Sequence, residues 1–208
     1  MSFIREGVKY RSAMRKVSRT GRGGSSSSAK KGHWSQGLLT SMEDPDSKVK
    51  EDESVIVIRD KYPKARFHYL VLPKRDIPGI SSLTADDRSL LEHMEKVGLE
   101  LTKDQPNCEF KVGYHAVPSM QRLHLHVIST DFDSPCLKTK QHWNSFTTPF
   151  FLPSRDVREQ LQRDGAVTKM SREESDKYLK TSLKCHKCSA TPKNIPELKR
   201  HLLSHIDD

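Results

Sequence analysis

The sequence has no apolar run of about 18 residues, which is the length that a membrane-spanning helix requires. Its first ten residues include basic side chains but no apolar stretch leading to a small-residue cleavage site, so this segment does not read as a secretory signal. Hydrophobic residues make up 34% and charged residues 30% of the chain, a soluble composition. We therefore expect an intracellular protein that does not bind a membrane.

Cysteine is scarce, with four residues among 208, and this excludes a disulfide scaffold. Cys185 and Cys188 form a C-x-x-C pair, which in a reducing compartment fits metal ligands better than a disulfide. Cys108 and Cys136 are isolated, and we expect them to be ordinary small residues of the interior.

Excess positive charge is missing from the middle of the chain, although the net charge is +9. Residues 1–32 contain nine Lys or Arg against one acidic residue, and residues 181–208 contain five basic against three acidic residues. The segment between them carries about −1. Bulk charge thus argues against a basic nucleic-acid platform in the middle, and affinity for polyanions outside a pocket is expected from the two ends.

Residues 1–32 also lack apolar periodicity and are rich in Gly and Ser, so burial cannot offset the entropy cost of ordering them. The composition predicts a disordered basic tail. Two functions remain open for it: a nuclear-localisation or DNA-tethering arm, and a solvated low-complexity leader.

Residues 33–150 are predicted to form a globular α+β domain. Short segments rich in β-branched and apolar residues predict strands at 54–60, 66–73, 108–117 and 123–129. Between the second and third strands, Thr84 and Asp87 resemble a capping box, and apolar residues at helical spacing then predict a helix of about 18 residues. The order strand, strand, helix, strand, strand indicates an antiparallel sheet with helices. The charged segment 151–180 is predicted to be a connector with a helix over 155–163.

The last predicted strand contains two histidines, His124 and His126. Alternation along a strand turns both to one face, roughly 6 to 7 Å apart along the backbone, while Leu123, Leu125 and Val127 face the core. Three interpretations remain open from these residues alone. The pair could bind a metal, which needs a third donor that the neighbouring sequence does not mark; it could be structural; or it could perform covalent catalysis at phosphorus, for which neutral imidazole is a good nucleophile.

The sequence around the histidines resembles a known family. Gly113-Tyr-His-Ala-Val-Pro-Ser-Met120 precedes the histidine strand and Ser129-Thr-Asp-Phe-Asp-Ser-Pro135 follows it, while Asp60-Lys-Tyr-Pro-Lys-Ala-Arg66 and His68-Tyr-Leu-Val-Leu-Pro73 come earlier. Together they resemble the histidine-triad superfamily and, within it, the aprataxin family, over residues 33–150 and again over 183–208. The resemblance implies the histidine-triad (HIT) fold. One position departs from the family's triad, because Arg122 stands where the first histidine is expected.

The resemblance implies a role for each matching residue. His124 is implied as the nucleophile and His126 as a contact to the phosphate, while His68, His115 and Lys64 are implied to stabilise charge or handle protons. Asp60 is implied to bind the ribose hydroxyls and Ser119 the α-phosphate, with Leu38 and Met120 beside the nucleotide. Trp34 is implied as a stacking residue at the DNA end. The implied activity is removal of AMP from 5′-adenylated DNA ends through an adenylyl-histidine, with no metal needed for catalysis.

A second motif lies near the C-terminus, where Cys185 and Cys188 are followed after 12 residues by His201 and then by His205. This is the spacing of a C2H2 zinc finger, with both histidines one turn apart on a predicted helix, and it predicts a structural Zn²⁺. So short a unit, residues 181–208, has little core of its own and should fold only with the metal. Lys199 and Arg200 are candidate DNA contacts.

The presence of a single finger distinguishes between the competing functional hypotheses. A DNA-binding regulator would need several fingers, because one finger contacts only about three base pairs. A hydrolase of small nucleoside phosphoramidates or dinucleoside polyphosphates would have no use for a finger. We therefore expect a nuclear DNA-repair hydrolase whose partners are damaged DNA and the product AMP. Many aprataxins carry a forkhead-associated domain, for which this chain has no room, so scaffold partners are not implied.

Overall fold

The structure, a computed structural model, describes residues 37–205 of the chain. The predicted tail at residues 1–32 and the predicted stacking residue Trp34 lie outside this range.

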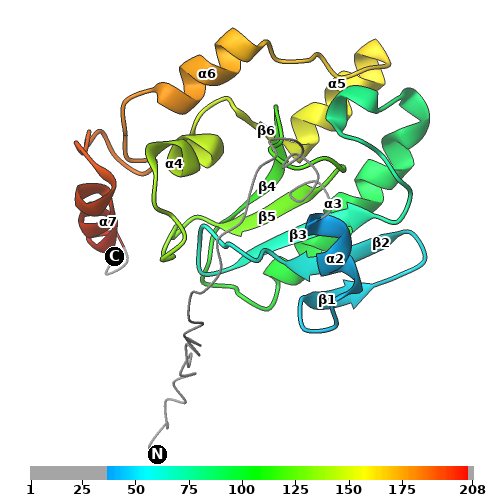
Figure 1. Cartoon of the computed structure of the whole chain (residues 1–208), viewed down its shortest axis with the longest axis horizontal. Coiled ribbons are helices and arrows are strands. Elements are labelled where there is room, and N and C mark those ends of the chain that lie inside the picture. Colours follow the sequence, from blue (N-terminus) through cyan, green and yellow to red (C-terminus); the bar gives the residue numbers. More distant parts are fainter. Residues whose placement is uncertain (1–36, 206–208) are drawn as a thin grey trace, which may run out of the picture. The chain divides into compact units, whose positions relative to one another are not determined.

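Six antiparallel strands form one sheet in the order β1-β2-β3-β5-β4-β6 (Figure 1). Its four central strands correspond to the four predicted from sequence: β2 (Val55–Arg59), β3 (His68–Pro73), β5 (Leu125–Ser129) and β4 (Phe110–His115). The edge strands β1 (Lys48–Glu51) and β6 (Phe151–Pro153) are additional. Both escape sequence reasoning because β1 is mostly charged and exposed, and β6 is only three residues long and ends in proline. The predicted α+β class and the antiparallel pairing are confirmed.

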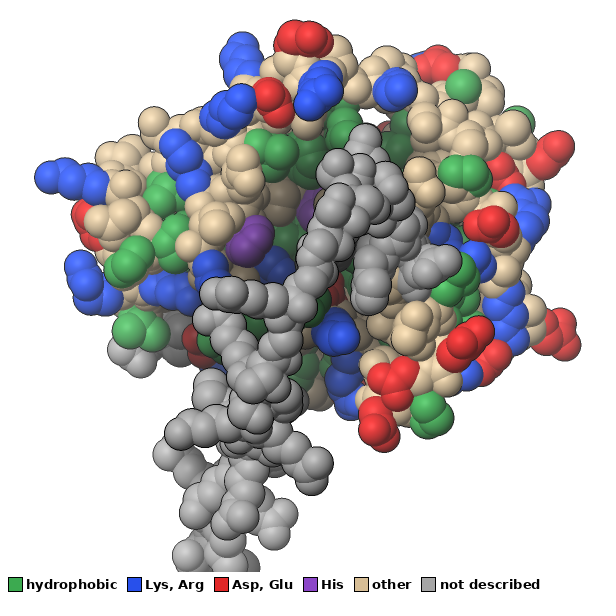
Figure 2. Space-filling model, in the orientation of Figure 1, with side chains coloured by type: hydrophobic (Ala, Val, Ile, Leu, Met, Phe, Trp, Pro, Cys, Tyr) green, Lys and Arg blue, Asp and Glu red, His purple; other side chains and the backbone are tan. Residues whose placement is uncertain are grey.

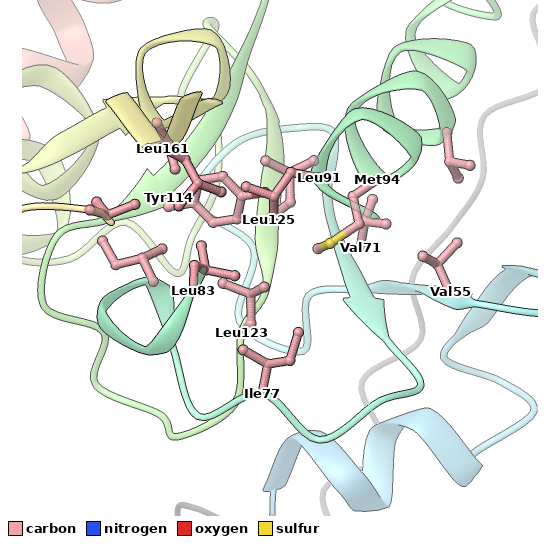
Figure 3. Close-up of a cluster of buried hydrophobic side chains, with 14 of the residues drawn as sticks. Val55, Val71, Ile77, Leu83, Leu91, Met94, Tyr114, Leu123, Leu125 and Leu161 are labelled. Carbon is pink, nitrogen blue, oxygen red and sulfur yellow. The ribbon is translucent and has the colours of Figure 1, made fainter. Parts of the chain in front are cut away.

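One face of the sheet is covered by α3 (Arg88–Thr102) and α5 (Ser154–Asp164), which enclose the larger core (Figure 3). Leu123, Leu125 and Val127 lie in this core, as their alternation predicts. The helix predicted after Thr84 begins later than expected. The Thr84 amide does donate to the Asp87 carboxylate over 2.9 Å, but this bond closes the 3₁₀ turn η2 (Ala85–Asp87), and α3 starts only at Arg88.

The core extends beyond the predicted domain boundary at residue 150. Strand β6 pairs with β4, and α5 buries Val157 and Leu161 against α3. The helix predicted over 155–163 is confirmed as α5, and these two apolar residues, four positions apart, form its narrow buried stripe. The predicted connector therefore contributes both a strand and a helix to the predicted α+β domain.

Within residues 37–205, the opposite face of the sheet is covered at its two ends, by α2 (Gly37–Glu43) and α4 (Lys140–Thr147) (Figure 1). Helix α2 packs Leu38 and Met42 over alternate residues of β2 and β3. Helix α4 packs Trp143 and Phe146 beside Ile128 at the other end. The strand residues between these two patches are histidines.

The C-terminal unit consists of α6 (Arg172–Lys180), a Cys-containing loop and α7 (Ile195–Leu203). It shares its apolar contacts with the catalytic domain, because Leu198, Leu202 and Cys185 belong to the same buried cluster as Trp143. The Trp143 Nε1–H also donates to the Lys184 carbonyl over 3.0 Å. The finger therefore packs on α4 rather than standing apart. None of the described helices is long and apolar enough to cross a membrane.

Candidate active site

Four histidines from three strands meet on the partly covered face. His68 begins β3, His115 ends β4, His126 lies within β5, and His124 immediately precedes that strand. Strand register brings them together, since Leu70 and Gly113 flank His126 on the two sides. The rings of His124 and His126 lie 4.8 Å apart, so the predicted shared face is confirmed. Figure 2 shows histidine side chains near the centre of this view, with Lys and Arg side chains around them.

Hydrogen bonds fix which nitrogen of His126 carries a proton. The Lys64 amide donates to His68 Nδ1 over 3.1 Å, so this nitrogen has a lone pair and the His68 proton sits on Nε2. His68 Nε2 then donates to His126 Nδ1 over 3.0 Å. His126 is left with an Nε2–H that is buried and has no partner among the described residues. This donor is free to bind an incoming oxygen.

His124 has the opposite arrangement. Its Nδ1 lies 2.8 Å from the Arg122 carbonyl, which can only accept, so the His124 proton sits on Nδ1. The lone pair is then on Nε2, the nitrogen available to a substrate. The site therefore presents a nucleophilic nitrogen next to a hydrogen-bond donor, as attack at a phosphoryl group requires.

Burial keeps these imidazoles neutral. It lowers the pKa of His124, an effect opposed in part by the Arg122 carbonyl and the Asp60 carboxylate. It lowers the pKa of His68 to about 4, and it holds the pKa values of His115 and His126 well below the ordinary value. An imidazole must be unprotonated to act as a nucleophile, so burial favours the form of His124 that can attack.

Asp60 and Lys64 flank the histidines at the end of β2. Asp60 Oδ1 accepts the Tyr62 amide over 2.7 Å, and its Oδ2 lies 3.5 Å from His68 Nδ1. Because His68 Nδ1 already accepts the Lys64 amide, the Asp60–His68 contact is one between a carboxylate and a neutral ring. The half-buried Lys64 ammonium donates to the Tyr62 carbonyl, and burial lowers its pKa. The Lys64 ammonium and the Asp60 carboxylate thus lie together on one side of the histidine cluster.

Phe146 is a site residue that the sequence reasoning did not identify. Its ring centroid lies 5.4 Å from those of His68 and His126 and 4.7 Å from that of His115. Phe146 provides much of the apolar wall that keeps water from the histidines. Its signal in the sequence is the spacing of three residues from Trp143, which places both rings on one face of a helix.

The remaining predicted site residues are distributed around this centre. Leu38 is buried and Met120 packs against the same small apolar cluster, so these two do come together. Ser119 is exposed, in the loop before the histidine strand. Arg200 is exposed on α7, whereas the Lys199 ammonium donates to the Ser134 carbonyl over 2.7 Å and bridges the finger to the catalytic domain.

A metal at the histidines would need donors that the sequence did not mark, and the structure supplies candidates. Donor atoms of Asp60, His68 and His126 lie within 4.8 Å of one another. However, His68 and His126 use their facing nitrogens on each other, and the other His68 nitrogen accepts the Lys64 amide. With a lysine ammonium beside them as well, these residues fit a hydrogen-bond relay better than a cation site.

The second donor cluster consists of Cys185, Cys188, His201 and His205, the predicted zinc ligands. The two histidine Nε2 atoms lie 3.2 Å apart, and each lies within 3.5 Å of one cysteine Sγ. Ideal tetrahedral Zn²⁺ with bonds of about 2.0 to 2.3 Å places its donors about 3.3 to 3.8 Å apart. The separations of 3.1 to 3.5 Å lie at or slightly below this range, and the donor set is that of a zinc site. His205 lies two residues beyond the end of α7 rather than within the predicted helix.

Comparison with known proteins agrees with this geometry. Residues 33–142 match the family described as "Scavenger mRNA decapping enzyme C-term binding", and residues 147–208 match the "C2HE / C2H2 / C2HC zinc-binding finger" family. The Aprataxin of Danio rerio is 50% identical over 178 residues, which are 84% of this chain and 54% of that protein. The Aprataxin-like protein of Schizosaccharomyces pombe is 33% identical over 76% of this chain and 73% of its own length. The chain belongs to the aprataxin family.

Solved structures of the aprataxin family share the fold. The aprataxin ortholog Hnt3 from Schizosaccharomyces pombe matches with a TM-score of 0.64 at 27% identity, over 82% of this chain and 90% of that one. A structure of that ortholog in complex with DNA matches with the same score at 25% identity, over 84% and 93% of the two chains. The predicted HIT fold is thereby confirmed. The chain spans about half the length of the Danio rerio and Gallus gallus aprataxins that it matches.

Proposed function

We propose that this protein removes AMP from 5′-adenylated DNA ends and that His124 is the nucleophile. The observation that carries the proposal is the pair of assigned tautomers, a lone pair on His124 Nε2 beside a proton on His126 Nε2. Family membership and the solved complex of an aprataxin ortholog with DNA support a DNA substrate over a small nucleotide.

The reaction has two steps. His124 Nε2 forms a bond to the α-phosphorus of the AMP cap, and the bond from that phosphorus to the DNA 5′-phosphate oxygen breaks, which releases the DNA. Water then attacks the same phosphorus, the bond to His124 breaks, and AMP leaves. His126 Nε2–H donates to a non-bridging phosphate oxygen throughout, while the Lys64 ammonium offsets the negative charge.

The other predicted site residues complete the proposal. Asp60 binds the ribose hydroxyls, since a carboxylate accepts two hydrogen bonds from a diol. Ser119 binds the α-phosphate, and Leu38 and Met120 contact the nucleoside. His115 helps to handle protons. No metal is required in either step, because positioned donors and a cation stabilise the charge.

The zinc finger, in this proposal, binds Zn²⁺ for structure and holds duplex DNA through Arg200. The basic residues 1–32 direct the protein to the nucleus, which a fluorescent fusion with and without that segment would test.

The test of the activity is incubation of the purified protein with nicked DNA that carries a 5′-AMP cap, followed by separation of AMP from the DNA. We expect stoichiometric AMP and ligatable 5′-phosphate ends, with no release by His124→Ala or His124→Asn. Acid quenching should trap an adenylylated protein with the adduct on His124. Retained activity in either variant, or an adduct on another residue, would rule out this assignment.

A further inference from the structure

Arg122, which takes the place of the first histidine of the triad, has an unusual backbone conformation. Its φ is 102°, and Phe132 is the other non-glycine residue with positive φ in the described range 37–205. This value lies beyond even the small left-handed basin near +57°. A branched or long side chain rarely adopts such a conformation unless its surroundings impose it.

The surroundings of Arg122 do impose it. The Arg122 amide donates to the Pro78 carbonyl over 3.0 Å, and one guanidinium nitrogen, Nη2, donates to the carbonyls of Pro73 and Lys74 over 3.0 and 2.8 Å. The other, Nη1, lies 3.2 Å from Asp76. Only 11% of the Arg122 side chain is exposed, whereas Asp76 is 85% exposed, so the ion pair is screened by water and contributes less than the two carbonyl hydrogen bonds.

These contacts connect the segment that precedes the histidine strand β5 to the loop that follows β3. They hold the chain so that the Arg122 carbonyl turns toward His124 Nδ1, 2.8 Å away. We propose that Arg122 is a positioning residue, whose guanidinium clamp on residues 73–76 aims its own carbonyl at His124 and so keeps the reactive lone pair on Nε2. The inference rests on the proposed function of His124 but concerns a different residue and a different observable.

Arginine suits this role for a chemical reason. Its Nη2 group donates to the Pro73 and Lys74 carbonyls at once while Nη1 faces Asp76, an arrangement of three contacts that a histidine ring cannot make.

The experiment measures the tautomer directly in the full chain without substrate. Protein labelled with ¹⁵N-histidine gives NMR shifts that distinguish a protonated Nδ1 from a protonated Nε2, and His124→Gln assigns the resonance. In the wild type we expect a single Nδ1–H tautomer at His124. In Arg122→Gln, whose shorter side chain does not reach the Pro73 and Lys74 carbonyls, we expect a mixture of the two.

We expect kcat for AMP release to fall as the fraction of His124 in the Nδ1–H tautomer falls. With 5′-adenylated nicked DNA, kcat of Arg122→Gln should fall roughly tenfold or more, because a histidine in the wrong tautomer cannot attack, while KM changes less than about twofold. Arg122→Lys, with one cationic donor instead of a fork, should be intermediate in both measurements. Arg122→Gly relieves the strained φ but removes the clamp, so it should behave like Arg122→Gln.

Arg155→Gln is the matched control. It removes an exposed guanidinium on α5 that pairs with Glu159, outside both residues 73–76 and the histidine strand, so tautomer and kcat should stay at the wild-type level. A wild-type tautomer in Arg122→Gly or Arg122→Gln would overturn the inference, as would an effect on KM alone, which would indicate direct substrate binding. If the tautomer responds but the wild type releases no AMP, the proposed function fails and the positioning role of Arg122 stands.

Discussion

His68 Nε2 lies 3.0 Å from His126 Nδ1, and this contact decides which nitrogen of His126 carries its proton. The His68 orientation is itself set by the Lys64 amide, so a backbone group in the loop between β2 and β3 controls a donor on β5. The geometry of that loop thus determines, through His68, where the His126 proton lies.

Replacing His68 should therefore impair catalysis without removing a substrate contact. His68→Phe preserves the ring volume but leaves the Lys64 amide and His126 Nδ1 without partners. The His126 proton is then no longer confined to Nε2, so the proposed donor to the phosphate is weakened and we expect kcat for AMP release to fall roughly 100-fold. His68→Gln, whose amide can donate to His126, should recover part of the loss.

Tyr69→Phe is the control, because Tyr69 follows on the same strand but packs on the opposite core. The test is to measure kcat for AMP release by the three variants at one pH, with circular dichroism to check that each variant folds. Equal activities of His68→Phe and the wild type would show that His126 does not need this partner.

The buried histidines also make stability depend on pH. Burial lowers the pKa of His68 to about 4, while in the unfolded chain it is near 6.5. The unfolded state therefore binds the extra proton first, so the His68 contribution is complete above about pH 6.5 and is lost as the pH falls toward 4.

We expect the free energy of unfolding from urea titrations to decline steeply between pH 6.5 and 4. His68→Gln should reduce that slope near pH 5 by up to about 1.4 kcal/mol per pH unit, which corresponds to one proton. Release of zinc in acid affects both proteins and cancels in the difference. Parallel curves for the two proteins would mean that His68 is protonated in the folded state.

The sequence predicted the strands and the shared histidine face well, because both follow from alternation over a few residues. It could not predict that His68, 58 positions before His126, is its hydrogen-bond partner, since strand order is not local information. For the same reason the Phe146 wall was not foreseen. The Arg122 carbonyl, only two residues from His124, was missed because its direction depends on the unusual φ of 102° at Arg122. Family resemblance marked His68 and His115 as site residues, but their tautomers depend on distances that only the structure supplies.

Trp34 lies outside the described residues, and its predicted role as a stacking residue remains a prediction. Trp34→Ala should weaken the adenylated DNA substrate by about 1–3 kcal/mol, the usual range for stacking on a base, and should affect a small adenosine phosphoramidate less. Comparison of kcat/KM for the two substrates measures this. Equal losses on both would indicate that Trp34 belongs to the core.

The finger was expected to bind DNA without influencing the chemistry, but its packing indicates a second role. Cys185 is buried in one cluster with Trp143 and Phe146, and Phe146 contacts the rings of His68, His115 and His126. The cluster that contains Cys185 thus reaches the pocket histidines through Phe146. Loss of zinc should loosen α7, expose Trp143 and let water reach the histidine pocket.

We accordingly expect Cys185→Ser to lower turnover of both adenylated DNA and a small adenosine phosphoramidate, and to shift the emission of Trp143 to longer wavelength in a Trp34→Phe background.

Arg200→Ala should act differently, because Arg200 is exposed and its loss leaves the cluster intact. It should raise KM for DNA and reduce the salt slope of binding by about one, with small-substrate turnover unchanged. Arg163→Ala, an exposed arginine on α5 at the other face of the sheet, is the control and should alter neither. If Cys185→Ser leaves small-substrate turnover intact, the finger and the pocket are independent; if Arg200→Ala leaves the salt slope unchanged, Arg200 does not contact the DNA backbone.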